Sequence, residues 1–98
     1  MRFVWDEHKE WLNRRKHRIG FEAAASIFQD PGLLSLLDRV VESEERWFSV
    51  GMGRGLVVLA VAYTVKEEQG EETIRIISAR KASPREKTEY ERQGKKDR

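Results

Sequence analysis

Two arginines occur in a stretch whose residue types suit phosphate chemistry. Arg75 and Arg80 belong to the run Ile74-Arg75-Ile76-Ile77-Ser78-Ala79-Arg80-Lys81, in which β-branched residues alternate with cations. Such a run predicts a strand at the surface of a sheet. A guanidinium group is planar, keeps its proton and binds two phosphate oxygens at once. The run therefore predicts a rigid, positively charged platform that can grip a phosphate backbone.

The two arginines have opposite parity along this strand. On a regular strand their side chains would lie on opposite faces of the sheet. Both can reach one site only if the strand ends or bulges near Ser78. The alternative is that one arginine forms a structural ion pair with Glu45 or Glu86, because ion-pair networks and active sites look alike in a sequence.

A second set of polar residues follows helical spacing near the start of the chain. Asp6, Lys9, Asn13 and Lys16 are three, four and three residues apart, so they share one face of a helix. His17 lies at the edge of that face and is the side chain there that titrates near neutrality, as an acid or a base requires. The alternatives are ordinary ion pairing on an exposed helix and, for His17, a C-terminal helix cap.

A third set of residues predicts the start of a helix after the strand. Ser83 is a good N-cap, Pro84 fits the first helical position, and Glu86 stands where a capping box needs its carboxylate. Tyr90 follows Glu86 by four residues and shares its face. A tyrosine there can stack on a nucleobase or assist proton transfer, or it can simply pack the helix on the sheet. The histidines and acids show no metal-ligand spacing, so we expect neither a metal nor another cofactor.

Hydropathy and turn signals predict the order of the elements. The order strand–helix–helix–strands–helix predicts an α+β domain, with an antiparallel sheet, two N-terminal helices and a C-terminal helix on one side of it. The apolar residues of segment 33–41 fit helical spacing. The predicted strands are 2–5, 46–50, 56–64 and 73–79, and the predicted helices are 6–17, 21–28 and the segment after Pro84.

Composition indicates one small domain. We expect it to span residues 1–92, with a disordered basic tail over 93–98. Charged residues make up 37% of the 98 residues, although the net charge is only +2, and there is no cysteine. The longest apolar run, 56–63, is too short to span a membrane, and no apolar signal segment follows Met1. These features predict a cytoplasmic protein with no membrane partner.

Short motifs occur in one order from Phe3 to Tyr90. They are Trp5-Asp6, Arg15-Lys16-His17, Phe21-Glu22-Ala23-Ala24, Glu45-Arg46 with Gly51, Thr64, the run from Ile74 to Glu86, and Tyr90. Their order and spacing together resemble the BrnT family, which are small ribonuclease toxins of bacterial type II toxin–antitoxin systems. Arg18 departs from the family, which usually has glycine there, and this puts the turn after the first helix in question. The leucine-rich segment 33–41 is a second departure.

The resemblance implies a RelE-like, barnase-like fold with a strand at 33–41. It also implies a metal-independent endoribonuclease that uses the RNA 2′-hydroxyl as the nucleophile and inhibits translation. Such chemistry needs a general base, a general acid and cations around the reacting phosphate. The residues expected to be catalytic are Arg75, Arg80, His17 and Lys16, and those expected to bind substrate are Lys9, Asn13, Lys81 and Tyr90.

The resemblance further implies a cognate antitoxin that is similar to BrnA, a ribbon-helix-helix DNA-binding protein. The complex could also include a toxin homodimer. Two other kinds of function stay open from the sequence: a non-catalytic nucleic-acid-binding module on the same basic surface, and a protein-interaction domain whose charges serve only a partner.

Overall fold

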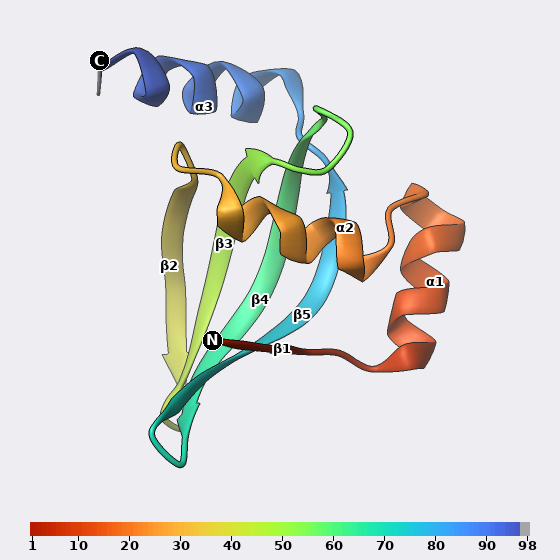
Figure 1. The fold of residues 1–98 in the computed structure, drawn as a ribbon, viewed down its shortest axis with the longest axis vertical. Coiled ribbons are helices and arrows are strands. Elements are labelled where there is room, and N and C mark those ends of the chain that lie inside the picture. Colours follow the sequence, from red (N-terminus) through yellow and green to blue (C-terminus); the bar gives the residue numbers. More distant parts are fainter. Residues whose placement is uncertain (97–98) are drawn as a thin grey trace.

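The computed structural model describes residues 1–96 as a five-stranded sheet with helices packed around it (Figure 1). The strands are β1 (Arg2–Val4), β2 (Leu34–Val41), β3 (Glu44–Met52), β4 (Val58–Glu68) and β5 (Glu71–Lys81). The helices are α1 (Glu7–His17), α2 (Phe21–Ala25), the 3-10 helix η1 (Ser26–Gln29) and α3 (Pro84–Lys96). Within this part of the chain, no helix has the length and apolar character of a membrane span.

The sheet is mixed, which corrects the predicted antiparallel sheet. Its strand order is β1-β5-β4-β3-β2, and β2 to β5 form an antiparallel meander. β1 runs parallel to β5, with Arg2 opposite Thr73 and Val4 opposite Arg75. The two strands are far apart in the sequence, so no hairpin dictates their direction, and the residue pattern of a three-residue strand carries no directional signal. The α+β class itself is confirmed.

The strands extend beyond their apolar segments. β4 and β5 pair as far as Glu68 and Glu71, joined by a two-residue turn in which Gln69 and Gly70 both have positive φ. Such a turn matches the twist of a hairpin and keeps the charged strand ends in register. The turn between β2 and β3 is built the same way. Segment 33–41 is a strand, as the resemblance implied, and the predicted helix 21–28 is split into α2 and η1.

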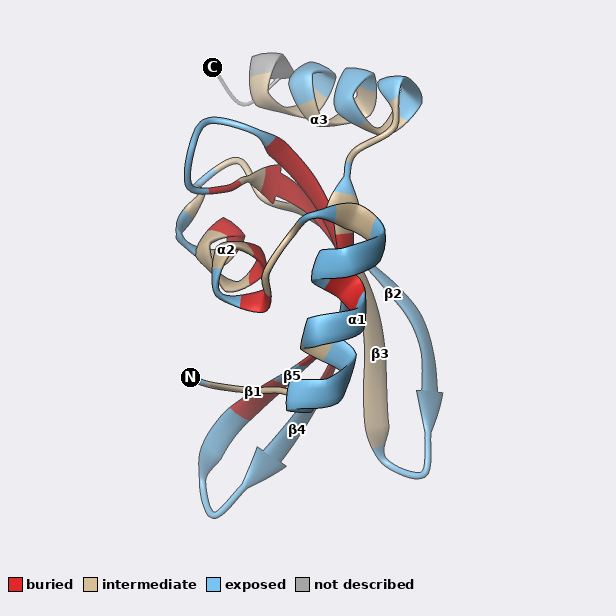
Figure 2. Ribbon diagram, turned by 90° about the vertical axis from the view of Figure 1, so that its right-hand side faces the viewer, coloured by how far each residue is buried: buried red, intermediate tan, exposed pale blue. Residues whose placement is uncertain are grey.

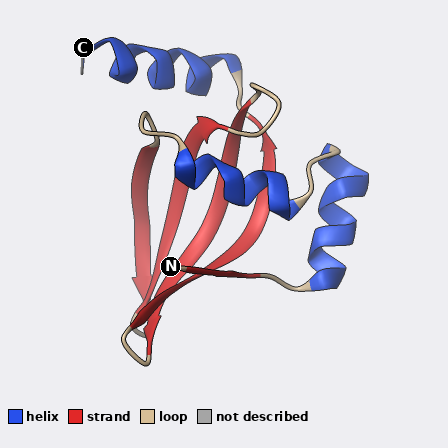
Figure 3. Cartoon of the chain, viewed as in Figure 1, coloured by secondary structure: helices blue, strands red, loops and turns tan. Residues whose placement is uncertain are grey.

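The core has a layer on each face of the sheet. Alternate residues of β4 point to opposite faces. Leu59, Val61 and Tyr63 pack with Phe21 and Ile27 beneath α2 and η1. On the other face, the side chains that pack with Tyr90 of α3 are Val50, Val58 and Ala60. The prediction that the helices lie on one side is therefore wrong, because α3 packs through Tyr90 on the face opposite α2. Figures 2 and 3 show α2 along the sheet and α3 across one end of it.

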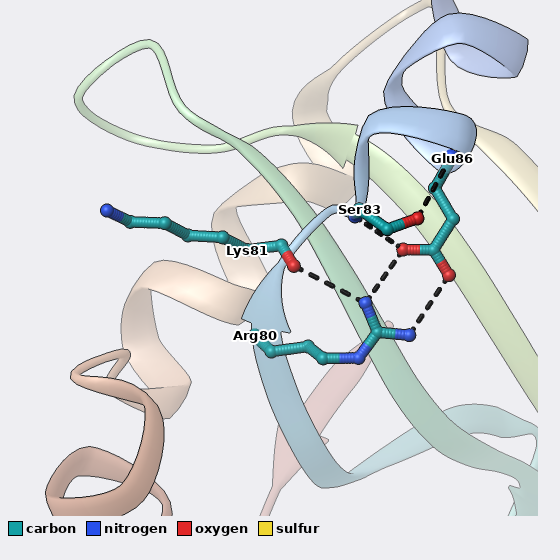
Figure 4. A network of polar contacts seen from close by, with 4 residues as sticks. All are labelled: Arg80, Lys81, Ser83 and Glu86. Atoms are coloured by element: carbon teal, nitrogen blue, oxygen red, sulfur yellow. Dashed lines mark hydrogen bonds and ion pairs between the residues drawn. The ribbon is translucent and has the colours of Figure 1, made fainter.

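The start of α3 is the predicted capping box (Figure 4). The backbone N–H of Glu86 donates to Ser83 Oγ at 3.2 Å, and the backbone N–H of Ser83 donates to Glu86 Oε1 at 2.8 Å. α3 then extends to Lys96, past residue 92, where the sequence predicts the domain to end. Residues 97–98 of the predicted tail lie outside the described residues.

The first helix also begins and ends in an identifiable way. Asp6 is the N-cap, as predicted, and its Oδ1 accepts from the backbone N–H of Lys9 at 3.0 Å. Arg18 ends the helix in the left-handed conformation, with φ of 62°, and its N–H donates to Arg14 O at 2.9 Å. Glycine is the usual residue in this conformation, so Arg18 adopts a backbone geometry that glycine would favour.

Candidate functional site

β5 contains a one-residue bulge in the middle of the strand. Ala62 of β4 is opposite Ser78, but the next residue, Tyr63, is opposite Ile76, so Ile77 has no counterpart on β4. A bulge of this kind interrupts the strict alternation of side chains between the two faces. The buried positions on β5 reflect the change, because Ile76 lies in the core before the bulge and Ala79 after it.

The bulge places both predicted arginines on the same face of the sheet. Arg75 is opposite Thr64 and Arg80 is opposite Ala60. Residues directly opposite in an antiparallel pair share a face, and Ala60 and Thr64 have the same parity on β4. We call this the open face; α3 covers it only toward Ala60. The sequence condition for a shared site, a bulge near Ser78, is therefore met.

A row of arginines crosses the open face beside Thr64. Arg39 on β2 is opposite Arg46 on β3, Arg46 is opposite Thr64 on β4, and Thr64 is opposite Arg75 on β5. We call Arg39, Arg46 and Arg75 the arginine row. A pocket of about 500 Å³ opens over it, and Lys9 of α1 also lines this pocket. Of the predicted site residues, the structure therefore brings Arg75 and Lys9 together.

The arginine row carries more charge than its surroundings neutralise. Among the described residues, neither Arg46 nor Arg75 forms an ion pair, and Arg39 pairs only with its exposed neighbour Asp38, at 3.7 Å. The Nε of Arg46 is buried and has no hydrogen-bond partner. A buried N–H without an acceptor is costly, and an anion in the pocket would relieve that cost. Two carboxylates, Asp38 and Glu44, also line the pocket.

Arg80 forms an ion pair within the fold, whereas Arg75 forms none among the described residues. Its guanidinium lies 5.7 Å from the centre of the Phe48 ring and forms a two-pronged ion pair with Glu86, at 2.7 and 3.0 Å (Figure 4). These hydrogen bonds lower the pKa of Glu86 to about 2 and raise the pKa of Arg80. The structural ion pair that the sequence allowed for is therefore present, with Glu86 as the partner. Glu45, the other candidate, instead accepts from Trp47 Nε1.

Asn13 is buried between α1 and β5. Its side-chain Nδ2 donates to Ala79 O and to Ile19 O, each at 2.8 Å, and its Oδ1 accepts from Ala79 N at 3.1 Å. The amide thus pairs with the free edge of β5 as a neighbouring strand would. Both donor hydrogens are used, so in this structure Asn13 holds α1 against β5. Lys9, one turn earlier, is carried to the rim of the pocket by this contact.

Lys16, His17 and Lys81 lie apart from the arginine row. α1 runs alongside β5, from Lys9 near Arg75 to Asn13 at Ala79. Lys16 follows Lys9 by seven positions, which corresponds to roughly 10 Å along the helix. Lys16 and His17 therefore lie toward the Lys81 end of β5, away from the pocket, and none of the three lines it.

Tyr90 is tied into the structure by Asp30. Its hydroxyl donates to Asp30 Oδ2 at 2.5 Å, and the same carboxylate accepts from the backbone N–H groups of Met52 and Gly32 at 2.7 and 2.8 Å. Burial and this hydrogen bond raise the pKa of Tyr90 to about 12. Burial alone would raise the pKa of Asp30, but the hydrogen bonds it accepts outweigh burial and lower it. In this structure Tyr90 anchors α3, the packing role that the sequence left as an alternative.

Sequence reasoning did not select four charged residues of the pocket. They come from β2 and β3, and their proximity to Arg75 depends on the register of four strands: Asp38, Arg39, Glu44 and Arg46. The available signal was the Glu45-Arg46 motif, which was noticed as a family feature but assigned no role. No group of three or more His, Cys, Asp or Glu residues within 1–96 is arranged to hold a metal ion.

An arrangement of three arginines and a lysine around one pocket suits an anionic polymer. The family model for the ribonuclease toxin BrnT of type II toxin–antitoxin systems matches residues 5–86. The chain therefore belongs to this family of ribonuclease toxins, whose systems pair the toxin with an antitoxin. No curated protein matches the chain closely enough to count as a relative.

Proposed function

We propose that this chain is a metal-independent endoribonuclease toxin and that the pocket over the arginine row is its active site. The observation that carries the proposal is the line Arg46–Thr64–Arg75, which sets two unpaired guanidinium groups on adjacent sides of one threonine. The buried, unpartnered Nε of Arg46 is a donor directed to no protein acceptor. A phosphate group supplies the acceptor oxygens that both arginines lack.

The reaction is an attack by the RNA 2′-hydroxyl on the adjacent phosphorus. A bond forms between the 2′-oxygen and phosphorus, the bond to the 5′-oxygen breaks, and the phosphorane between them carries extra negative charge. Arg46 and Arg75 stabilise that charge from the rigid sheet, and Lys9 adds a third cation from α1. Because these side chains supply the positive charge, the chemistry needs no divalent ion.

Two proton transfers accompany the attack. A base takes the proton of the 2′-hydroxyl, and an acid gives a proton to the leaving 5′-oxygen. We assign the base to Glu44, a carboxylate that lines the pocket, and the acid to Lys9. Lys16, His17 and Lys81 then bind the RNA backbone beyond the pocket. This replaces the sequence-based assignment of acid–base chemistry to His17 and of phosphate contacts to Arg80.

The wider setting of this activity is also part of the proposal. RNA cleavage by the chain would inhibit translation, and a BrnA-like, ribbon-helix-helix antitoxin would neutralise it. The antiparallel meander with helices on its faces supports the RelE-like fold that the resemblance implied.

The test is cleavage of a single-stranded RNA by the purified chain, freed of antitoxin, in buffer containing EDTA. We expect cleavage products with 2′,3′-cyclic phosphate ends and a strong loss of rate in Glu44→Gln. His17→Ala should bind RNA more weakly but cleave at nearly the wild-type rate when RNA is saturating. Loss of cleavage on chelation that a divalent ion restores would contradict metal independence. RNA binding without cleavage would favour the non-catalytic module instead.

A further inference from the structure

The outer edge of β2 is the feature of the fold that the ribonuclease activity leaves unexplained. β2 is the last strand of the sheet and pairs only with β3 (Figure 1). Large apolar side chains on it are exposed to solvent: Leu36 by 61%, Val40 by 58%, and also Leu37 and Val41 (Figure 2). Proteins usually protect an edge strand with charges, proline or a covering segment, and exposed apolar edges mark sites of pairing with another chain.

Hollows lie next to this strand and are lined by apolar residues. A groove of about 450 Å³ runs between β2 and α3, lined on the sheet by Leu34, Leu36, Phe48 and Val50. A second hollow of about 560 Å³, which also includes Leu36 and Phe48, is lined by Trp47 and Ala62 as well. Side chains of an added strand would therefore find apolar surface beside β2 as well as along it.

We propose that the antitoxin docks here by adding a β-strand to the outer edge of β2. The occupant is an extended segment whose apolar side chains alternate, with an acidic residue placed beside Arg39. The unpaired N–H and C=O groups on the outer edge of β2 can form a ladder of hydrogen bonds with the backbone of another strand. RNA has no peptide groups and cannot form this ladder. The acidic residue follows from charge complementarity, because Arg39 is exposed and its one ion pair among the described residues is a 3.7 Å contact with exposed Asp38, while Arg46 opposite it has none.

This docking site also accounts for neutralisation. Asp38 and Arg39 of β2 line the pocket over the arginine row, so a strand added at β2 lies at the rim of the proposed active site. A carboxylate on that strand would compete with an RNA phosphate for Arg39. The inference rests on the proposed antitoxin partner, but it does not depend on the proposed catalytic residues.

The test uses the toxin and the product of the reading frame next to its gene as the probe. Leu37→Lys and Val40→Lys place a charge on the docking strand without touching the pocket. Leu56→Lys is the matched control, because Leu56 is 84% exposed but lies between β3 and β4. We expect the two β2 variants to bind the probe roughly thirtyfold more weakly or worse, as loss of an interface anchor does, and the control to bind normally.

Free toxin gives the second measurement. All three variants should melt near the wild type and cleave RNA at the wild-type rate. In the wild-type complex, amide hydrogens of residues 34–41 should exchange more slowly than in the free toxin. If the wild type does not cleave RNA but the β2 variants still bind the probe more weakly than the wild type does, the proposed activity is wrong and the docking site is supported.

Three results would overturn the docking site. One is unchanged binding of the probe by both β2 variants. Another is a free wild-type dimer that becomes a monomer in these variants, since the occupant would then be a second copy. The last is a folded β2 variant that binds the probe normally but no longer binds RNA.

Discussion

Arg80 and Glu86 meet edge to edge across the junction of β5 and α3. Nη1 of Arg80 donates to Oε1 of Glu86 at 2.7 Å and Nη2 to Oε2 at 3.0 Å, while Oε1 also accepts from Ser83 N. One carboxylate therefore closes the capping box and fixes the preceding strand at the same time (Figure 4). The end of the sheet and the start of the last helix are held as one unit.

Arg80→Ala should lower stability more than activity. The variant loses a two-pronged ion pair that is only partly exposed to solvent, which we expect to cost about 2 kcal/mol and lower the melting temperature by roughly 10 °C. Cleavage per folded molecule should stay within a few-fold of the wild type. A calorimetric scan and a cleavage assay on the same preparation decide this. A hundredfold loss of cleavage at an unchanged melting temperature would restore Arg80 to the active site.

The same ion pair should make the free energy of unfolding depend on pH in the acidic range. The folded-state pKa of Glu86 is about 2, below its ordinary value of 4.5, so its contribution is present above pH 4.5 and is lost as the pH falls toward 2. Arg80 is 41% exposed, so we discount the shift to roughly 2 kcal/mol at neutral pH. Urea unfolding of the wild type and of Glu86→Gln should therefore differ at pH 7 and converge near pH 2. A constant difference across this range would contradict the assignment.

Arg75→Ala should reduce cleavage without unfolding the protein. Loss of one donor to the developing charge typically reduces the rate by roughly 10²–10³-fold. Arg75→Lys should be intermediate, because a point charge survives while the two-pronged geometry is lost. Arg54→Ala is the matched control, since Arg54 is exposed and pairs with Glu22 outside this pocket. Equal rates for the Arg75 and Arg54 variants would remove Arg75 from catalysis.

Asn13→Asp should act through the fold. A carboxylate cannot donate to Ala79 O and Ile19 O, so a buried carbonyl of β5 and a partly buried carbonyl after α1 lose their donor. We expect a loss of about 3 kcal/mol, measured by denaturant unfolding. Lys9→Ala is the comparison, because it should reduce cleavage with little effect on stability. If Asn13→Asp were as stable as the wild type yet bound RNA weakly, Asn13 would be a substrate contact, as the sequence suggested.

Arg18→Gly should stabilise the protein. Arg18 holds a φ of 62°, a conformation that costs an ordinary residue roughly 1 kcal/mol relative to glycine. Glycine should recover about that amount in free energy of unfolding, because the hydrogen bond from its N–H to Arg14 O needs no side chain. Arg15→Gly, inside the helix, should instead be destabilising. Stabilisation by neither substitution would mean that the Arg18 side chain offsets its backbone strain.

Local signals predicted most of the fold. The capping box at Ser83, the N-cap at Asp6 and the apolar strand of β4 are encoded within a few residues, and the structure confirms each. The direction of β1 and the face covered by α3 depend on contacts between distant segments, so residue patterns do not contain them.

The candidate site was predictable only in part for the same reason. Arg75 was selected from its residue type on a strand, Lys9 from helical spacing together with the family resemblance, and both line the pocket. Arg46 and Arg39 join them through strand register, which a single sequence does not reveal. Asn13 and Tyr90 form hydrogen bonds within the fold, and a sequence does not distinguish such anchors from ligand contacts, so their role in substrate binding stays a prediction.

The bulge at Ile77 changes which residue numbers of β5 point to each face of the sheet. Before it, odd-numbered positions of β5 face the arginine row; after it, even-numbered positions face the same side. A strand that kept all of these residues but lacked the bulge would turn Arg80 toward the core and Ala79 away from Asn13. Deleting Ile77 would instead restore the regular alternation and leave Arg75 and Arg80 on the same face.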